Sequence, residues 1–329
     1  MSFANQTAFA ALPVPTIDAQ GHDVLAVLVK GTYLVDRAGS VRPAPDPSPV
    51  RVSDEVYEPD SPRTSARFPS DLGFQKRGAD VVLQGDAIAP AKVTSLDVAV
   101  KVQDRIAPLR VHGPRVYFSG AFGMSISAAQ PFERVPIVYE RAYGGMTDDA
   151  SMVELANPAG VGVARRPSDL EHRPAPQIEH PARPHTSASD RHPPMGYGAL
   201  MSHWAPRMKY AGTFDDRWRA TRLPILPEDY DIRFGNVAHP SLQLDDPLAP
   251  GDPVAVTGMS LAPLAFALPD FRFAARARFD DGSRAVLTPP IDLLLLQPEL
   301  GRFELLGRAV FPIGRGRRVL REVVVTRDA

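Results

Sequence analysis

The stretch SLDVAVKVQ, residues 95–103, decides the fold that we expect for this chain. Apolar residues return there at every second position, and those that share one face are Leu96, Val98, Val100 and Val102. A period of two residues is that of a β-strand, because successive side chains of a strand point to opposite faces of the sheet. The stretch therefore predicts a half-buried strand.

The same alternation returns near the C-terminus, in residues 271–280. Asp281-Gly282 follows at once, and this dipeptide favours a tight turn from which residues 285–287 can return antiparallel. Other apolar runs bounded by turn residues predict further strands at 24–35, 81–88, 109–118, 135–142, 254–257, 291–296, 303–311 and 319–326.

Proline is the outlier of the composition, with 35 residues in 329, which is about twice the usual share. A proline inside a helix removes a backbone donor and clashes with the preceding turn, so long helices are not expected. We predict a mainly β fold with two sheet-rich, sandwich-like regions, residues 1–145 and 225–329. A long Pro-rich irregular segment, residues 146–224, is expected to connect them and to pack between or across them.

Composition also limits the classes of partner. Lysine and arginine number 37 against 38 acidic residues, so no global field favours nucleic acid or anionic lipid. The chain has no cysteine, which excludes disulfides, thiolate nucleophiles and zinc sites of the cysteine type. Residues 1–16 lack the pattern of a signal peptide, and no apolar run approaches the roughly 18 residues of a membrane helix. We therefore expect a cytoplasmic protein without membrane insertion.

Four histidines lie in residues 157–195, a Pro-rich stretch without apolar periodicity that predicts a long loop with a binding role or a mobile lid. They are His172, His180, His185 and His192. Their spacing fits neither a helical pair nor a zinc finger, and the surrounding arginines repel cations. The sequence predicts solvated loop histidines, with no metal site and no cofactor.

Catalytic patterns are weak. Gly258-Met259-Ser260-Leu261-Ala262 resembles a nucleophile elbow but lacks the final glycine, and Pro263 follows instead of a helix. A carbohydrate-active or other hydrolytic β-protein could use a carboxylate pair drawn from Glu140, Asp215, Asp216, Asp229 and Asp231. These carboxylates also suit turns, caps and ion pairs. We expect no enzymatic activity, and the hydrolase stays the alternative.

Both tryptophans, Trp204 and Trp218, lie within the aromatic-rich residues 197–230. Arginines occur among them, at Arg207, Arg217, Arg219 and Arg222. Tryptophan with arginine is typical of binding hot spots, whereas tryptophan alone more often anchors a core. A second arginine cluster, Arg308, Arg315, Arg317, Arg318 and Arg321, predicts a solvated sheet edge.

The string PFERVPIVYERAYGG, residues 131–145, resembles the most characteristic block of a bacterial family of unknown function. Further similar blocks follow in the expected order, at residues 30–33, 71–80, 85–90, 157–160, 204–207, 211–218, 226–231 and 240–243. The resemblance spans roughly residues 5–310 as one family unit. Members of that family are typically encoded beside type VI secretion spike genes, and some join effectors to the VgrG spike or its PAAR tip.

The resemblance implies a non-enzymatic adaptor or chaperone that binds a type VI effector or PAAR-containing cargo and helps to load it onto VgrG. A structural or secreted component of the same system is a further alternative. The residues that we expect to contact the partner are Trp204, Arg207, Arg217, Trp218, Tyr139, Glu140 and Arg141.

Overall fold

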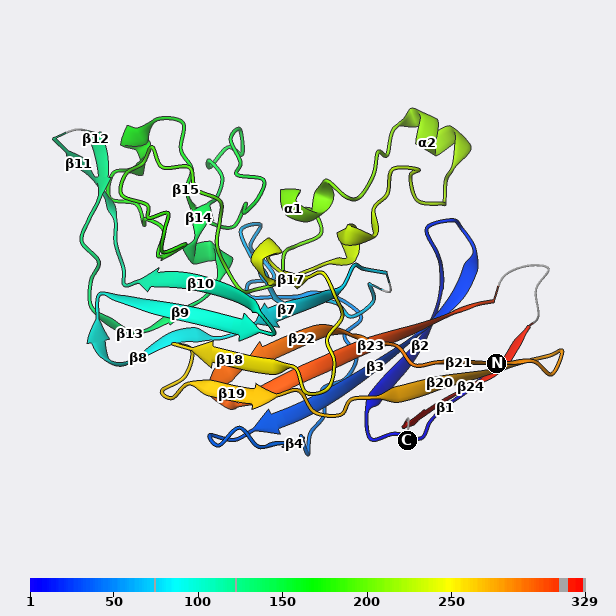
Figure 1. Ribbon diagram of the computed structural model, residues 1–329. Coiled ribbons are helices and arrows are strands. Elements are labelled where there is room, and N and C mark those ends of the chain that lie inside the picture. The colour runs from blue at the N-terminus through cyan, green and yellow to red at the C-terminus, as the bar shows by residue number, and fades with distance from the viewer. Residues whose placement is uncertain (74, 122, 314–318, 328–329) are drawn as a thin grey trace.

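The computed structural model describes residues 1–329 except 74, 122, 314–318 and 328–329 (Figure 1). Strands make up 43% of the chain and helices 8%. The α-helices among these residues are short, α1 (Ala205–Met208) and α2 (Asp216–Thr221), and no helix in the described part has the length and apolarity of a membrane span. The prediction of a mainly β fold with little helix is confirmed.

The largest sheet has seven strands (Figure 1). Its central pair is β3 (Asp23–Val35) and β23 (Arg302–Pro312), which run antiparallel from Val24 opposite Pro312 to Leu34 opposite Arg302. The remaining strands are β17 (Gln243–Leu244), β7 (Ala79–Leu83) and β22 (Ile291–Gln297) on the β23 side, with β2 (Ala10–Ile17) and β4 (Val41–Pro43) paired to β3.

Two smaller sheets complete the framework. The five-stranded sheet has the order β16 (Ile178–Glu179), β10 (Arg105–His112), β9 (Ser95–Val102), β18 (Pro253–Thr257) and β19 (Leu264–Ala267). The four-stranded sheet holds both ends of the chain, in the order β1 (Ser2–Asn5), β24 (Leu320–Arg327), β20 (Phe273–Phe279) and β21 (Arg284–Leu287).

Short strand pairs and 3₁₀ turns form the connections. The pairs are β5 (Glu55–Val56) with β6 (Ala66–Phe68), β8 (Asp86–Val93) with β13 (Phe132–Pro136), β11 (Tyr117–Gly120) with β12 (Gly123–Ile126), and β14 (Tyr143–Gly144) with β15 (Val161–Gly162). The 3₁₀ turns are η1 (Tyr139–Arg141), η2 (Pro167–Leu170), η3 (Ile232–Gly235), η4 (Pro240–Leu242) and η5 (Pro298–Leu300).

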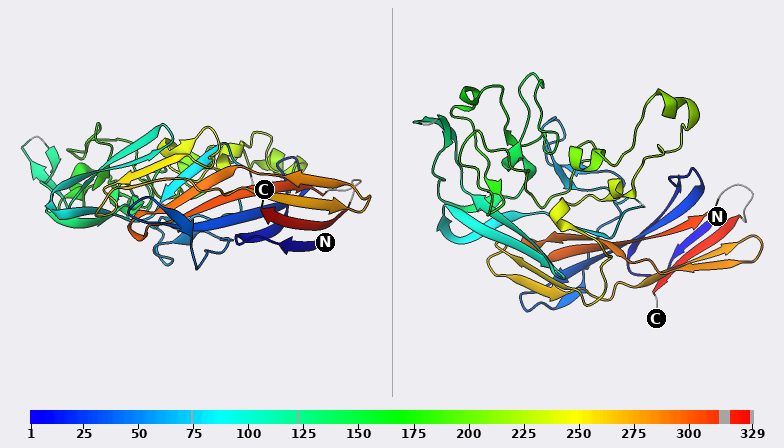
Figure 2. Two further views of the ribbon diagram at one scale, coloured as in Figure 1. Left: turned by 60° about the horizontal axis from the view of Figure 1, so that its bottom comes forward. Right: turned by 45° about the horizontal axis from the view of Figure 1, so that its top comes forward.

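Strands from the two ends of the chain share sheets. β9 lies between β10 and β18, and β3 lies between β2 and β23. Residues 146–224 contribute only β15, β16 and short helices to the described structure, and they lie along one side of the large sheets (Figures 1 and 2). Within this segment only β16 joins one of the large sheets, and the next strand along the chain is β17.

The core explains two strand patterns. Val98, Val100 and Val102 of β9 are fully buried and alternate with the more exposed Asp97, Ala99 and Lys101, as the alternation of residues 95–103 predicts. β3 is buried at almost every position, because both of its faces are covered, and such a strand reads as an unbroken apolar run. The predicted turn after β20 is also present, with Gly282 at φ +81°.

Three predictions of a single continuous strand are wrong. Residues 81–88 divide into β7 and β8 at Gly85, whose φ is +150°, and residues 109–118 divide into β10 and β11 at Gly113, which lies against the carbonyl of Gln130. Residues 135–142 leave the sheet after Pro136 and form η1. The Asn157 side chain stabilises that turn by donating to the carbonyls of Tyr139 and Tyr143 at 2.8 and 3.0 Å.

The irregular segment is packed against the body. It contributes Leu170, Ala175 and Ala188 to a small second core with Tyr117 and Met124. His185 is buried as well, and its ring stacks on Tyr143 at a centroid distance of 5.2 Å. The prediction that all four loop histidines are solvated is therefore wrong for His185, because residues 157–195 fold back onto the sheet through β16.

Charged side chains lie inside the core beside the central strand pair. Lys30 of β3 is completely buried and contacts Asp71, and its Nζ lies 3.4 Å from Oε2 of Glu304 on β23. Arg51 donates to both oxygens of Glu304, at 2.5 and 2.8 Å. Burial alone would raise the pKa of Glu304, but the hydrogen bonds from Arg51 and the charges of Lys30 and Arg51 outweigh it and lower the pKa to about 2.

Removing the Glu304 charge should destabilise the fold. In Glu304→Gln the buried cations Lys30 and Arg51 lose a counter-charge, and breaking such a buried network costs about 3–5 kcal/mol. The exposed pair Arg278–Glu322 is the control, because Glu322→Gln should cost less than about 1 kcal/mol. Urea unfolding of both variants measures the difference, and equal losses would contradict the structural role of the buried network.

His239 fixes one connection through its neutral form. Its Nδ1 accepts from the Ser241 amide at 3.2 Å, which caps η4, and its Nε2 lies 3.2 Å from the Pro194 carbonyl. Nδ1 must stay unprotonated to accept that bond. Desolvation lowers the pKa of His239 to about 4, although the ring keeps partial contact with solvent.

This arrangement predicts a loss of stability below neutral pH. The unfolded chain binds a proton at His239 near pH 6.5 and the folded chain does not, so stability falls between about pH 6.5 and 4. With allowance for solvent contact, the contribution is about 2 kcal/mol. His239→Gln should flatten this part of the urea-measured stability profile. A slope identical to that of the unaltered protein would contradict the assignment.

Candidate functional site

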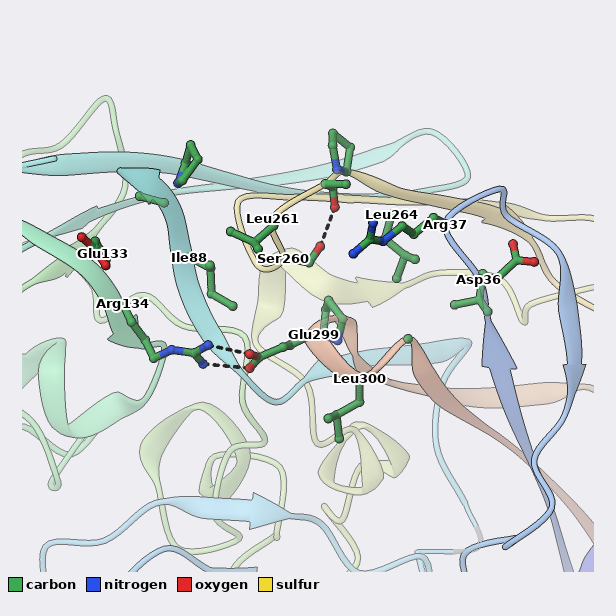
Figure 3. A pocket seen from close by; sticks show the side chains of 17 residues that line it. Asp36, Arg37, Ile88, Glu133, Arg134, Ser260, Leu261, Leu264, Glu299 and Leu300 are labelled. Atoms are coloured by element: carbon green, nitrogen blue, oxygen red, sulfur yellow. Dashed lines mark hydrogen bonds and ion pairs between the residues drawn. The ribbon is translucent and has the colours of Figure 1, made fainter. Parts of the chain in front are cut away.

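A groove of about 670 Å³ lies at the end of the central strand pair (Figure 3). Its walls come from the turn after β3, from β8 and β13, from the loop between β18 and β19, and from η5. The apolar side chains labelled in Figure 3 are Ile88, Leu261, Leu264 and Leu300. Segments distant in sequence thus form one open apolar surface.

Two leucines are presented to solvent by turn residues. Leu261 lies in the β18–β19 loop, which leaves the sheet at Gly258 with φ +76°, and its side chain is 71% exposed. Leu300 ends η5, where Gly301 closes the turn in the left-handed region, and it is 63% exposed. Large apolar side chains exposed in one concave surface are typical of binding sites.

Charges lie at both ends of the groove. At one end Arg134 bridges Asp86 at 2.8 Å and Glu299 at 2.5 and 2.8 Å, and the hydrogen bond from Arg134 lowers the pKa of Glu299. Glu133 lies at the same end, whereas Arg37 lies at the other (Figure 3). Neither Glu133 nor Arg37 has an ion-pair partner among the described residues, so each can meet a charge on a ligand.

The chemistry that this lining supports is binding. The Ser260 hydroxyl donates to the Ala262 carbonyl at 2.6 Å, so it shapes the loop, and no histidine lines the groove. A serine nucleophile needs a base within hydrogen-bond reach. An extended or looped segment of another protein could place its apolar side chains between the two leucines. Its charged side chains could then meet Glu133 and Arg37.

The residues expected from the sequence divide into two groups. Trp204 and Tyr139 meet edge to face at 5.1 Å, and each is only 1% exposed. Trp204 is therefore a core anchor beneath the irregular segment, which corrects its predicted place on a partner surface. Burying a ring of this size stabilises a loop that has few strand hydrogen bonds.

The neighbours of this aromatic pair also make internal contacts. Glu140 accepts from the Ser65 amide at 2.6 Å and hydroxyl at 2.8 Å, and Arg141 donates to the Gln177 side chain at 2.5 Å. Arg207 is almost buried and donates to backbone carbonyls. These side chains hold segments together in the described structure.

Arg217 and Trp218 lie together on an arm, residues 212–230, that stands out from the sheets around α2 (Figure 1). Asp215 caps α2 by accepting from the Trp218 amide at 2.8 Å, and the indole Nε1 donates to the Ile225 carbonyl at 2.8 Å. Arg217 is exposed, and the half-exposed Phe214 packs on Trp218 at 4.7 Å. This part of the predicted surface is accessible.

The five candidate carboxylates have local partners. Asp215 caps α2, Asp229 accepts from the Thr213 amide and hydroxyl at 2.9 and 2.8 Å, and Asp231 caps η3. Asp216 pairs with Arg219 at 2.6 Å on the same helix. Glu140 is bound to Ser65, as described above. These contacts are those expected of turn and cap residues.

Sequence reasoning missed the leucines of the groove. The signal was a leucine inside a turn context, in Ser260-Leu261-Ala262-Pro263 and in Pro298-Glu299-Leu300-Gly301. Turn residues keep a segment at the surface, so a leucine among them has little chance of burial. The partners of these loops in space could not be read from such local patterns.

Comparison with known proteins identifies a family. No curated protein and no solved structure is similar enough to match. A family model described as "Uncharacterized protein conserved in bacteria (DUF2169)" matches residues 20–308, which is most of the chain. The chain therefore belongs to the DUF2169 family of uncharacterized bacterial proteins.

Proposed function

We propose that this protein is a non-enzymatic adaptor or chaperone that binds a type VI secretion effector or a PAAR-containing cargo and helps to load it onto the VgrG spike. The observation that carries the proposal is the groove, with two exposed leucines and an unpaired charge at each end. The sequence resemblance described above supplies the class of partner.

The groove has the features that a protein ligand requires. Its apolar centre can exclude water from a partner's side chains, and its charged ends can fix the direction in which a segment lies. Its walls are held by the long pair β3–β23 and by the Arg134 bridge, so little conformational entropy is lost on binding. These properties favour recognition of a polypeptide.

The arm provides a second surface for the same function. An adaptor must hold its cargo and the spike at one time, and α2 of the arm lies far from β8, β13 and the β18–β19 loop, which wall the groove (Figures 1 and 2). Phe214 and Trp218 offer aromatic area, and Arg217 offers a charge at its edge. This mixture is typical of contacts that contribute strongly to binding.

Charged substitutions in the groove should weaken cargo binding. Leu261→Asp and Leu300→Asp each place a carboxylate where a partner's apolar side chain would lie, and each should raise the Kd at least tenfold, or about 1.4 kcal/mol. The ligands are PAAR-bearing and effector proteins encoded beside the gene of this protein. Co-purification detects their binding, and titration calorimetry measures the Kd. Leu155→Asp is the matched control, because Leu155 is 62% exposed but does not line the groove.

Two outcomes contradict this proposal. Capture of no effector, PAAR or VgrG protein would remove the adaptor function. Capture that is equally strong in the groove variants, with unchanged thermal melts, would leave an adaptor but remove the groove as its cargo site.

The arm should matter for a different partner. Replacing Arg217 and Phe214 by alanine leaves the Trp218–Ile225 bond in place, so the fold should keep its thermal stability. We expect this double variant to lose VgrG capture at least tenfold while cargo affinity stays unchanged, because the arm does not line the groove. Loss of cargo binding with intact VgrG binding would reverse the assignment of the two surfaces.

A further inference from the structure

A second, smaller cavity lies under α1, between η3 and the seven-stranded sheet, with a volume of about 190 Å³. Three cationic side chains line it: Lys76, Arg207 and Arg308. The side chains of Lys76 and Arg308 are 4% and 3% exposed, and Arg207 is 9% exposed. The sequence predicted Arg308 on a solvated sheet edge, and this prediction is wrong because the side chain is buried. Three other members of the same predicted arginine cluster lie outside the described residues: Arg315, Arg317 and Arg318.

Two of these cations are already balanced. Lys76 pairs with the buried Asp80 at 2.7 Å, and Arg308 pairs with Asp292. Arg308 also donates through Nε to the Asp71 carbonyl at 3.2 Å. Each of these two side chains therefore forms a neutral pair with its partner, and the pair adds no net charge to the cavity.

Arg207 is different because its partners are neutral. Nη1 donates to the Leu200 carbonyl at 2.8 Å, and Nε and Nη2 donate to the Phe234 carbonyl at 3.2 and 3.1 Å. No carboxylate lies within ion-pair distance of it among the described residues. Burial lowers the pKa of Arg207, which reflects the unfavourable removal of its charge from water.

The cavity offers what a small anion needs. The Arg207 guanidinium has N–H groups beyond those bonded to carbonyls, and a planar fork of this kind fits a carboxylate. The Ser202 hydroxyl has no hydrogen-bond partner in the described structure, and Ser70 also lines the cavity. Val237 and Leu293 supply an apolar wall. Asp54 is exposed and also lines the cavity, where it accepts from the Ser70 amide at 2.7 Å and its charge acts on Arg207 without forming an ion pair.

Volume and charge limit the ligand. A water molecule occupies about 30 Å³ in the liquid, so the cavity has room for a carboxylate group with a short carbon chain. Arg207 has no ion-pair partner among the described residues, so its fork can take one carboxylate, and the Asp54 carboxylate in the lining repels a phosphate dianion more strongly than a singly charged acid. We infer that this cavity binds a carboxylate, held by Arg207 and Ser202, as a free small acid or as a group presented by a partner protein.

Acetate and propionate are the probes for this inference. Thermal melts and titration calorimetry of the full chain, at constant ionic strength against sodium chloride, should show saturable stabilisation by either acid and a smaller effect of phosphate. Propionate should bind at least as tightly as acetate, because its methyl group can contact Leu293 and Val237. Melting temperatures that are the same in chloride, acetate and propionate would overturn the proposal.

Two variants test the site, so the result does not depend on whether one of them folds. Arg207→Lys keeps the charge but loses the fork, and Ser202→Leu fills the cavity at an exposed position and leaves Arg207 in place. Both should weaken propionate binding at least tenfold. Ser168→Leu is the control, because Ser168 is exposed on η2 away from the cavity. Unchanged binding in Ser202→Leu and Arg207→Lys would contradict the assigned site.

The same variants distinguish the two sources of the carboxylate. If a partner presents it, Ser202→Leu should weaken capture of the type VI cargo or of VgrG as well as propionate binding. If the ligand is a free acid, capture should be unchanged while propionate binding is lost. The propionate measurement needs no partner protein, so its result is independent of the adaptor function proposed above.

Discussion

The ammonium group of Lys30, buried beside the central strand pair, is the constraint on which the rest of the structure depends. A buried charge is tolerated only with counter-charges and hydrogen bonds, so Asp71 and Glu304 must meet it. Glu304 comes from β23, but Asp71 comes from a connecting segment. The Pro-rich chain between β4 and β7 therefore has to cross over β3, where the Pro49 carbonyl also accepts from Lys30.

The polar interior continues from this point and fixes other connections. Asp80 at the start of β7 accepts from Lys76, from the Asn236 side chain and from the Val237 amide. The chain before η4 is thereby attached to the seven-stranded sheet. Arg207 attaches α1 to the same region through the Phe234 carbonyl. Because the irregular segment is held in this way, Ser202 and Arg207 stay in the lining of the smaller cavity.

Local sequence patterns were sufficient for many of the strands but insufficient for the points where some strands end and for their partners. Alternation in residues 95–103 and the Asp281-Gly282 turn each predicted a local element that the structure contains. Gly113 divides one apolar run where the Gln130 carbonyl approaches it, and another run leaves the sheet after Pro136 for a turn that Asn157 stabilises, so those runs were wrongly read as single strands. Trp204 and Trp218 are equivalent in the sequence, yet Tyr139 covers one of them and the other lies on the arm. Burial of this kind depends on long-range contacts that no local pattern contains.

The central claim is that a partner protein occupies the groove. Hydrogen–deuterium exchange of the protein, alone and in complex with a PAAR-bearing cargo encoded beside its gene, tests this claim most directly. The account predicts slower exchange at the amides of residues 260–262 and 299–301 in the complex, since these residues line the groove and are partly or fully exposed to solvent in the free protein. Unchanged exchange in both loops, with protection confined to other surfaces, would contradict it.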